Sequence, residues 1–378
     1  MNILNRIDWR LTFILDVLFA VFLIATGTSW LGAIVITEIL FWLVRLLWIS
    51  QAMLRFILRR LLHMIPIVLA VLAIGFLLIQ LAPGDMFTQM QLRPDMNQGD
   101  LETFRRQFGL DQHWFIQFVL YLWNAIRGNF GLSITFRAPV FALVSQRAFN
   151  TILLSMTALI FSWGMSIPMG IIAATKQYKW QDQVISVFAF FGLAIPNFFL
   201  AFLLQYVITT TSTPPGTWLP IAGMMSIDHG SLSAVGRFFD VARHMILPVI
   251  VLGTAGMATL TRIMRANMLD IMNQQYIVTA RAKGQSERVV VYRHALRNAI
   301  NPMITILGFQ IANVMSGAAL TEVVLSWPGL GSLILSAITS QDLYLVVGSL
   351  LYSSVLLVVG NLIADILLAV VDPRVRIA

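Results

Sequence analysis

The chain has 378 residues, of which 58% are apolar and only 11% are charged, and its mean hydropathy is positive. A soluble protein keeps roughly a quarter of its residues charged, so this composition excludes an ordinary water-soluble domain and indicates several membrane spans of about 20 residues each. The absence of cysteine excludes disulfides, thiolate nucleophiles and cysteine metal sites. The net charge of +8 fits either nucleic-acid binding or basic cytoplasmic loops, and the placement of the charges decides between them.

Residues 1–52 form an apolar N-terminal extension. They hold two apolar runs, at 11–27 and 30–48, each interrupted by charged side chains and each short for a span. Three interpretations are open: a two-helix membrane hairpin, an amphipathic segment in the interface, or one tilted span. The apolar part is too long for a secretory signal and shows no small-residue cleavage site. We expect one or two membrane or interfacial helices that are retained.

The rest of the chain, 53–378, alternates apolar runs with polar stretches. The pattern predicts an all-α membrane protein with six core transmembrane helices and an extra N-terminal membrane-associated helix or hairpin. The predicted spans are residues 61–81, 151–174, 184–208, 245–263, 303–325 and 344–371.

The charges set the orientation of these spans. The segment before the first span, the loop at 176–182, the segment at 262–297 and the C-terminus together carry 14 basic and four acidic residues. The intervening loops carry eight basic and eight acidic residues. The positive-inside rule therefore predicts a cytoplasmic C-terminus, a cytoplasmic loop at 264–302 and an external loop at 83–147. Because the charge is spread over several loops, it disfavours nucleic-acid binding.

The segment 275–302 predicts two helices separated by a break. Residues 268–283 are mostly helix formers, and Gly284 can adopt the positive φ that ends a helix. Ser286 can cap the next helix, and Pro302 fixes the entry to the fifth span.

Two small residues and several basic ones characterise this helix pair. Ala280 and Ala282 would allow the groove of another protein to approach the backbone. The basic side chains would keep the surface in the cytoplasm. The alternative is a basic loop that only sets topology, but such a loop does not require a helix–glycine–helix unit. The basic residues are Arg281, Lys283, Arg288 and Arg293.

This segment resembles the EAA coupling motif of bacterial ABC importer permeases, in the form found in the dipeptide/oligopeptide/nickel branch. The shared pattern is a Tyr, then Thr-Ala-Arg-Ala-Lys-Gly, then His-Ala-Leu-Arg-Asn-Ala and a Pro. Val278-Thr279-Ala280 stands where the general motif has Glu-Ala-Ala. The resemblance covers about 53–376 and leaves residues 1–52 outside. Further segments that resemble the branch are 53–61, 82–85, 108–111, 128–133, 139–140, 320–322, 326–331 and 372–376.

The resemblance implies the type I ABC importer permease fold, in the subunit with the long external loop after the first core span. Such permeases lie in the bacterial inner membrane, in contact with lipid. It also implies three kinds of protein partner: a second homologous permease, giving a heterodimer, one or two ABC ATPase subunits, and a substrate-binding protein. ATP and Mg would bind to the ATPases, and no cofactor would bind to this chain.

In this family, each permease sets a short cytoplasmic helix into a groove of an ATPase. By resemblance, Ala280 to Gly284 would transmit force, and Tyr276, His294, Arg297 and Asn298 would shape the helix pair. The residues implied in ATPase coupling are Tyr276, Thr279, Ala280, Arg281, Ala282, Lys283, Gly284, His294, Arg297, Asn298 and Pro302.

Polar residues within or near the spans are candidates for the translocation pathway. Pro196 can kink the third span. The alternative role of such residues is interhelical hydrogen bonding, which is favoured for the amides. The pathway candidates are Asn197, Gln310, Asn313 and Glu322, and Gln205, Asn361 and Asp365 share their placement.

The sequence lacks the motifs of an enzyme. It has no Gly-x-x-x-x-Gly-Lys-Ser/Thr phosphate loop, so ATP must be hydrolysed by another chain. It has no His-Glu-x-x-His, and its five histidines are scattered. A serine intramembrane protease stays open as an alternative, as does an ATP-independent secondary transporter or channel. The resemblance favours di- and oligopeptides as substrates, with nickel chelates or oligosaccharides as the alternative.

Overall fold

The computed structural model describes residues 51–81, 112–211, 219–304, 306–307, 310 and 319–371. The chain forms two compact units, Met1–Met64 with Asp372–Ala378, and Ile65–Val371. In the smaller unit only the first turns of α3 (Gln51–Leu81) are described. The predicted N-terminal helices, and residues 305, 308–309 and 311–318 of the predicted fifth span, Asn313 among them, lie outside the described residues.

Four of the described helices are long and apolar enough to cross a membrane. They are α3, α7 (Val140–Thr175), α10 (Ala234–Met272) and α17 (Leu343–Val371). The prediction of a helical membrane protein with several apolar spans is therefore confirmed. These helices are longer than the roughly 20 residues that a membrane span needs. Their ends therefore extend beyond the hydrocarbon core of the membrane. The first turn of α10, for example, is capped by Ser233, whose hydroxyl accepts a hydrogen bond from the Gly236 amide at 3.2 Å.

The predicted third span is broken in the structure. It consists of α8 (Trp180–Ala194) and α9 (Asn197–Thr211), which are bent by 108°. Ile195 is extended, with φ −87° and ψ 120°, because a proline disfavours the helical conformation of the residue before it. The prediction that Pro196 interrupts the helix is confirmed.

Shorter elements connect the long helices. Strands β1 and β2 form an antiparallel hairpin in which Leu132 pairs with Pro139, a small addition to an otherwise helical fold. The shorter elements are α6 (Trp114–Ile126), β1 (Leu132–Ser133), β2 (Ala138–Pro139), η1 (His229–Ser231), α11 (Gln275–Ala282), α12 (Glu287–Val289), the π-helical η2 (Val290–Ala295), α13 (Leu296–Ala299), α15 (Ala319–Val324) and α16 (Leu330–Thr339).

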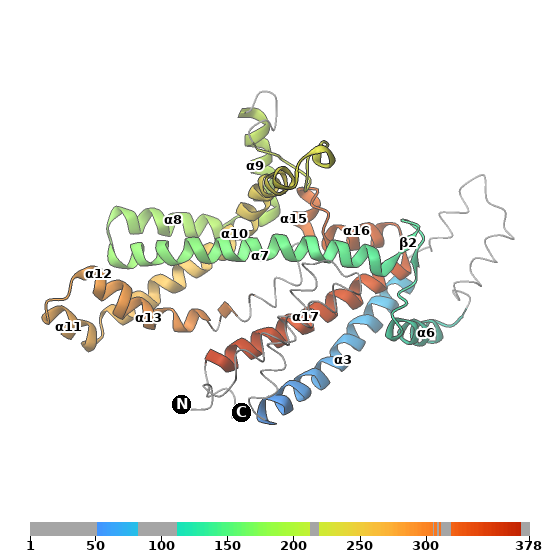
Figure 1. The fold of residues 1–378 in the computed structure, drawn as a ribbon, viewed down its shortest axis with the longest axis horizontal. Helices are drawn as coiled ribbons and strands as arrows, with labels where there is room; N and C mark the ends of the chain where they lie inside the picture. Colours follow the sequence, from blue (N-terminus) through green and yellow to red (C-terminus); the bar gives the residue numbers. More distant parts are fainter. Residues whose placement is uncertain are drawn as a thin grey trace. The chain divides into compact units, whose positions relative to one another are not determined.

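Helix α10 lies along α7 and α8 in the larger unit (Figure 1). The α7 and α10 backbones approach closely near the C-terminal end of α7. A Cβ atom on Gly170 would lie 2.6 Å from the Cβ of Met264, so only glycine fits there. The helices α11, α12 and α13 lie near this end of α7, and α6 and the hairpin lie near its other end (Figure 1).

Candidate coupling site

The segment 275–302 begins with a turn that the sequence did not reveal. The prediction of one helix over 268–283 is wrong, because α10 ends at Met272 and α11 starts at Gln275. Between them, Gln274 is extended, with ψ 147°. No glycine or proline marks this break. The turn lets α11 fold back so that Ile277 joins a buried cluster shared with α10.

Gly284 ends α11 as the sequence predicted. Its φ is +76°, and the Gly284 amide donates to the Arg281 carbonyl at 2.9 Å while the Gln285 amide donates to the Ala280 carbonyl at 3.3 Å. This pair of bonds is the Schellman arrangement, which satisfies carbonyl groups that a helix end would otherwise leave unpaired. The chain therefore reverses sharply at Gly284.

The second helix begins at Ser286, but its hydroxyl does not make the predicted cap. Ser286 is the N-cap residue of α12 and makes no side-chain capping bond. An ion pair closes the turn instead: the Arg281 guanidinium donates to the two Glu287 carboxylate oxygens at 2.7 and 3.2 Å. These hydrogen bonds lower the pKa of Glu287 and raise that of Arg281.

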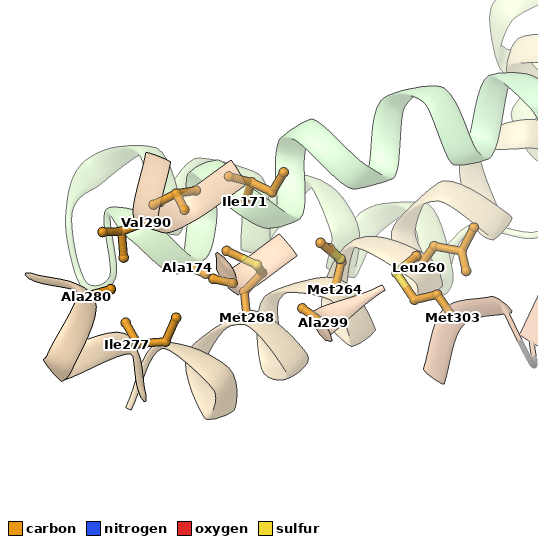
Figure 2. Close-up of a cluster of buried hydrophobic side chains, with 12 residues drawn as sticks. Ile171, Ala174, Leu260, Met264, Met268, Ile277, Ala280, Val290, Ala299 and Met303 are labelled. Atoms are coloured by element: carbon orange, nitrogen blue, oxygen red, sulfur yellow. The ribbon is translucent and has the colours of Figure 1, made fainter. Parts of the chain in front are cut away.

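The helix pair shares one buried cluster with α7 and α10 (Figure 2). Figure 2 shows Ile277 on α11 and Val290 on η2 directed toward the ends of those two long helices. This cluster connects the segment to the membrane helices through packed apolar side chains. Its members are Ile171, Ala174, Leu260, Met264, Met268, Ile277, Ala280, Val290, Val291, Ala295, Ala299 and Met303.

The two small alanines of the motif have different environments. Ala280 is only 7% exposed and belongs to the buried cluster, whereas Ala282 is exposed. The side chain of Ala280 therefore faces the interior of the segment, and its contact with another protein stays a prediction. Its small size serves packing within the chain, and Ala282 is the alanine that a partner can reach.

Polar contacts also join the two helices. The Asn298 amide donates to the Tyr276 hydroxyl at 2.9 Å, and the His294 Nε2 lies 2.7 Å from the Gln285 Oε1. On the α10 side, the Asn267 amide donates to the Ala299 carbonyl at 3.1 Å. The structure thus brings Tyr276, His294 and Asn298 together with the remainder of the segment.

The outward side of the segment is exposed and mixes apolar with basic groups. Tyr276, Val278 and Tyr292 are 43%, 51% and 60% exposed. Such a surface offers both aromatic contact area and positive charge to a partner. The other predicted coupling residues that are exposed are Thr279, Arg281, Ala282, Lys283, Gly284, Arg297, Asn298 and Pro302.

An ion pair that sequence reasoning missed lies near the base of the segment. The Arg265 Nε donates to Asp182 Oδ1 and the Nη2 donates to Oδ2, each at 2.7 Å. Asp182 is buried at the start of α8, and the Arg265 side chain is 28% exposed. The sequence showed these residues only as members of two charged loops, because they lie 83 positions apart.

The pathway candidates within the described residues contact different elements. Asn197 is the half-buried first residue of α9. The Gln310 Oε1 accepts a hydrogen bond from the Trp163 indole at 2.7 Å, which is the interhelical role favoured for amides. Glu322 is 1% exposed and accepts bonds from the Thr151 hydroxyl and the Gly331 amide. These contacts favour a structural role, and the pathway role of Glu322 stays a prediction.

Comparison with known proteins identifies the family of the chain. Residues 166–377 match the family described as the inner membrane component of binding-protein-dependent transport systems, and residues 53–157 match the N-terminal region of such membrane components. The oligopeptide transport system permease protein AppB of Bacillus subtilis is 41% identical over 321 residues, covering 85% of this chain and 98% of AppB.

Two Escherichia coli proteins are similar over nearly the same extent. The dipeptide transport system permease protein DppB is 34% identical over 336 residues, covering 86% of this chain and 99% of DppB. The glutathione transport system permease protein GsiC is 34% identical over 324 residues, with the same coverage of 86% and 99%. The chain therefore belongs to the binding-protein-dependent permease family and is the multi-pass inner-membrane component, not the ATPase, of an ABC importer.

Proposed function

We propose that this permease imports di- and oligopeptides delivered by a binding protein, and that residues 275–302 are the part of it that an ATPase contacts. The peptide substrate is supported by the names of its relatives, which are oligopeptide, dipeptide and glutathione permeases. Nickel chelates or oligosaccharides are the alternative substrates.

One observation carries the coupling proposal: the segment is buried on one side and exposed on the other. The buried side shares a cluster with α7 and α10, and the exposed side presents Tyr276, Val278 and Ala282. A partner that moves the exposed side must therefore move the membrane helices. This is the physical requirement for coupling ATP binding at one end of a two-state protein to substrate release at the other.

The remaining parts of the transporter follow from this role. A binding-protein-dependent permease works with an ATPase and a binding protein. We propose a second, homologous permease as its partner in a heterodimer, and one or two kinds of ATPase subunit that bind the ATP and Mg. The excess of basic residues in 262–297 and at the C-terminus supports a cytoplasmic location for both.

The absence of cysteine permits a direct test of the ATPase contact. In the assembled transporter, Ala282→Cys would be labelled with a photoreactive maleimide and irradiated. We expect a cross-link to the ATPase subunit. The matched control is Thr209→Cys, which is also exposed and lies near the end of α9. Equal cross-linking at both positions, or none at Ala282→Cys, would contradict the assignment.

Substrate class is tested separately by uptake. Cells that lack this permease should lose uptake of a labelled dipeptide and of a labelled oligopeptide, and the intact gene should restore it. Nickel and oligosaccharide uptake are measured in the same strains. Loss of nickel uptake with normal peptide uptake would show that the substrate is a nickel chelate and not a peptide. This result would leave the coupling proposal unaffected.

A further inference from the structure

Helix α6 exposes an apolar surface that coupling to an ATPase does not explain. Its sequence, Trp114–Ile126, contains no charged residue, although it lies in a stretch that the sequence analysis treated as a polar external loop. Val119, Trp123 and Ile126 are 47%, 54% and 81% exposed. The large exposed side chains of this outer face are Phe115, Ile116, Val119, Leu120, Trp123 and Ile126.

The opposite face fixes α6 against the membrane helices. Phe118 and Tyr121 are buried in a cluster with Phe76 of α3 and Val347 of α17. The Phe76 and Phe118 rings meet edge to face with centroids 5.9 Å apart. The helix is thus held in one orientation, and its outer face is directed away from this core.

The level at which α6 attaches corresponds to the edge of a membrane. Phe76 precedes the last residue of α3 by five positions, or roughly 7 Å along the helix axis. Val347 follows the first residue of α17 by four positions, which is roughly 6 Å. With 13 residues, α6 is about 20 Å long and too short to cross a hydrocarbon core of about 30 Å.

The part of α3 beside α6 also exposes apolar side chains. Close to Phe76, the α3 side chains Ile74, Leu77 and Leu78 are 58%, 40% and 62% exposed, as expected for a span in contact with lipid. Trp114 and Trp123 lie toward the two ends of α6, and tryptophan is enriched where a membrane meets water. The Arg127 guanidinium lies 4.5 Å from the centre of the Trp123 ring, which places a charge at the border of this apolar surface.

We infer that α6 is an interfacial helix whose outer face is buried among the lipids of one leaflet. The charge distribution assigns this leaflet to the external side. A binding protein is a poorer occupant, because it leaves after each delivery and would expose six large apolar side chains to water. The lipid surface is always present and also faces the exposed apolar side chains of α3. The segment before α7 thereby gains a fixed depth in the membrane.

Spin labels on the cysteine-free chain can measure this depth. Val119→Cys and Ile116→Cys would be labelled in the assembled transporter, without binding protein, in nanodiscs of phosphatidylethanolamine and phosphatidylglycerol. Leu78→Cys serves as the lipid reference, and Asp228→Cys, an exposed residue beside η1, serves as the water reference. Collision rates with oxygen and with a water-soluble nickel chelate are then compared.

The inference predicts that both α6 labels collide several-fold more with oxygen than with the nickel chelate, as Leu78→Cys does. Nickel accessibility equal to that of Asp228→Cys would place the face in water and overturn the inference. Low accessibility to both reagents would also overturn it, because it would show that a protein, such as the second permease, covers the face. Two positions guard against a local disturbance at one of them.

Discussion

Arg265 of α10 donates two hydrogen bonds, each 2.7 Å long, to the carboxylate of Asp182 at the start of α8. This geometry matches the fork of a guanidinium to both oxygens of a carboxylate, and it is the strongest form of such a pair. The Asp182 side chain is 5% exposed. The pair therefore fixes the turn after α7 to the part of α10 that leads into the coupling segment.

Replacing Arg265 with leucine should destabilise the permease by about 3 kcal/mol, because removing one partner leaves a buried carboxylate uncompensated. The thermal midpoint of the solubilised transporter should fall. Arg262→Leu removes the same charge from an exposed position on the same helix and should leave the midpoint nearly unchanged. Equal effects of the two substitutions would show that charge alone, and not the pair, matters.

Gly284→Val should abolish transport-coupled ATP hydrolysis while the permease still inserts into the membrane. The φ of +76° costs a residue with a side chain about 1–2 kcal/mol, although nothing lies within 4 Å of the Cβ position. The open space makes Gly284→Asn a matched control, because asparagine tolerates this conformation. ATPase activity stimulated by loaded binding protein is the measurement. Normal transport by Gly284→Val would refute the coupling role.

Ala280→Leu should impair the stability of the permease, whereas Ala282→Leu should impair its binding to the ATPase. A leucine at buried Ala280 overpacks the cluster and should cost about 1–3 kcal/mol of stability. A leucine at exposed Ala282 should leave the thermal midpoint unchanged and weaken co-purification of the ATPase. The two readouts are measured on both variants. A loss of stability in Ala282→Leu equal to that in Ala280→Leu would contradict the division between the inner and outer faces.

Glu322→Ala should lower the thermal midpoint strongly, because it leaves the Thr151 hydroxyl and the buried Gly331 amide without their acceptor. The expected cost is several kcal/mol. Glu322→Gln retains one acceptor oxygen and should be the milder variant. Gly329→Ala offers an independent check, since its Cβ would clash with the Glu322 carboxylate. Transport should fail in parallel with stability, and failure of transport at normal stability would support a pathway role for Glu322.

The Arg281–Glu287 pair should make the coupling turn sensitive to acid. The pKa of Glu287 is lowered in the folded protein by the hydrogen bond from Arg281, so the stabilisation is present above the unfolded pKa of about 4.3. It is lost as the pH falls through the lower folded pKa. Hydrogen exchange of the amides after Gly284 should therefore differ between the natural protein and Glu287→Gln at neutral pH.

This difference should disappear in acid, when Glu287 is itself protonated. The effect is small because both side chains are well exposed, at 39% for Arg281 and 60% for Glu287. A difference that persists unchanged at low pH would show that the substitution acts through some property other than the charge of Glu287.

The sequence predicted the helical membrane fold and the conformation of Gly284 because each depends on local chemistry. An apolar run reveals a span, and a glycine after a helical run reveals a positive φ. The break at Pro196 was likewise visible, because a proline restricts the residue before it. Helix α6 was not predicted, because its 13 residues are too few for a span and polar stretches flank them.

Other features depend on contacts between distant residues and could not be inferred from one sequence. Ala280 and Ala282 are identical in chemistry, and only the position of Ile277 and Val290 in the fold decides which of them is buried. The missing cap at Ser286 has a similar origin, because Arg281 and Glu287 already close the turn.

The buried cluster of the coupling segment has a mechanical consequence. To swivel alone, the segment would have to bring Ile277, Val290 and Val291 into water, at roughly 1.5–3 kcal/mol for each side chain. The segment should therefore move together with α7 and α10 as one rigid body, and it should not rotate relative to them as a hinge would. A small displacement of the exposed face should displace the ends of those helices. A movement of the helices should equally displace the exposed face.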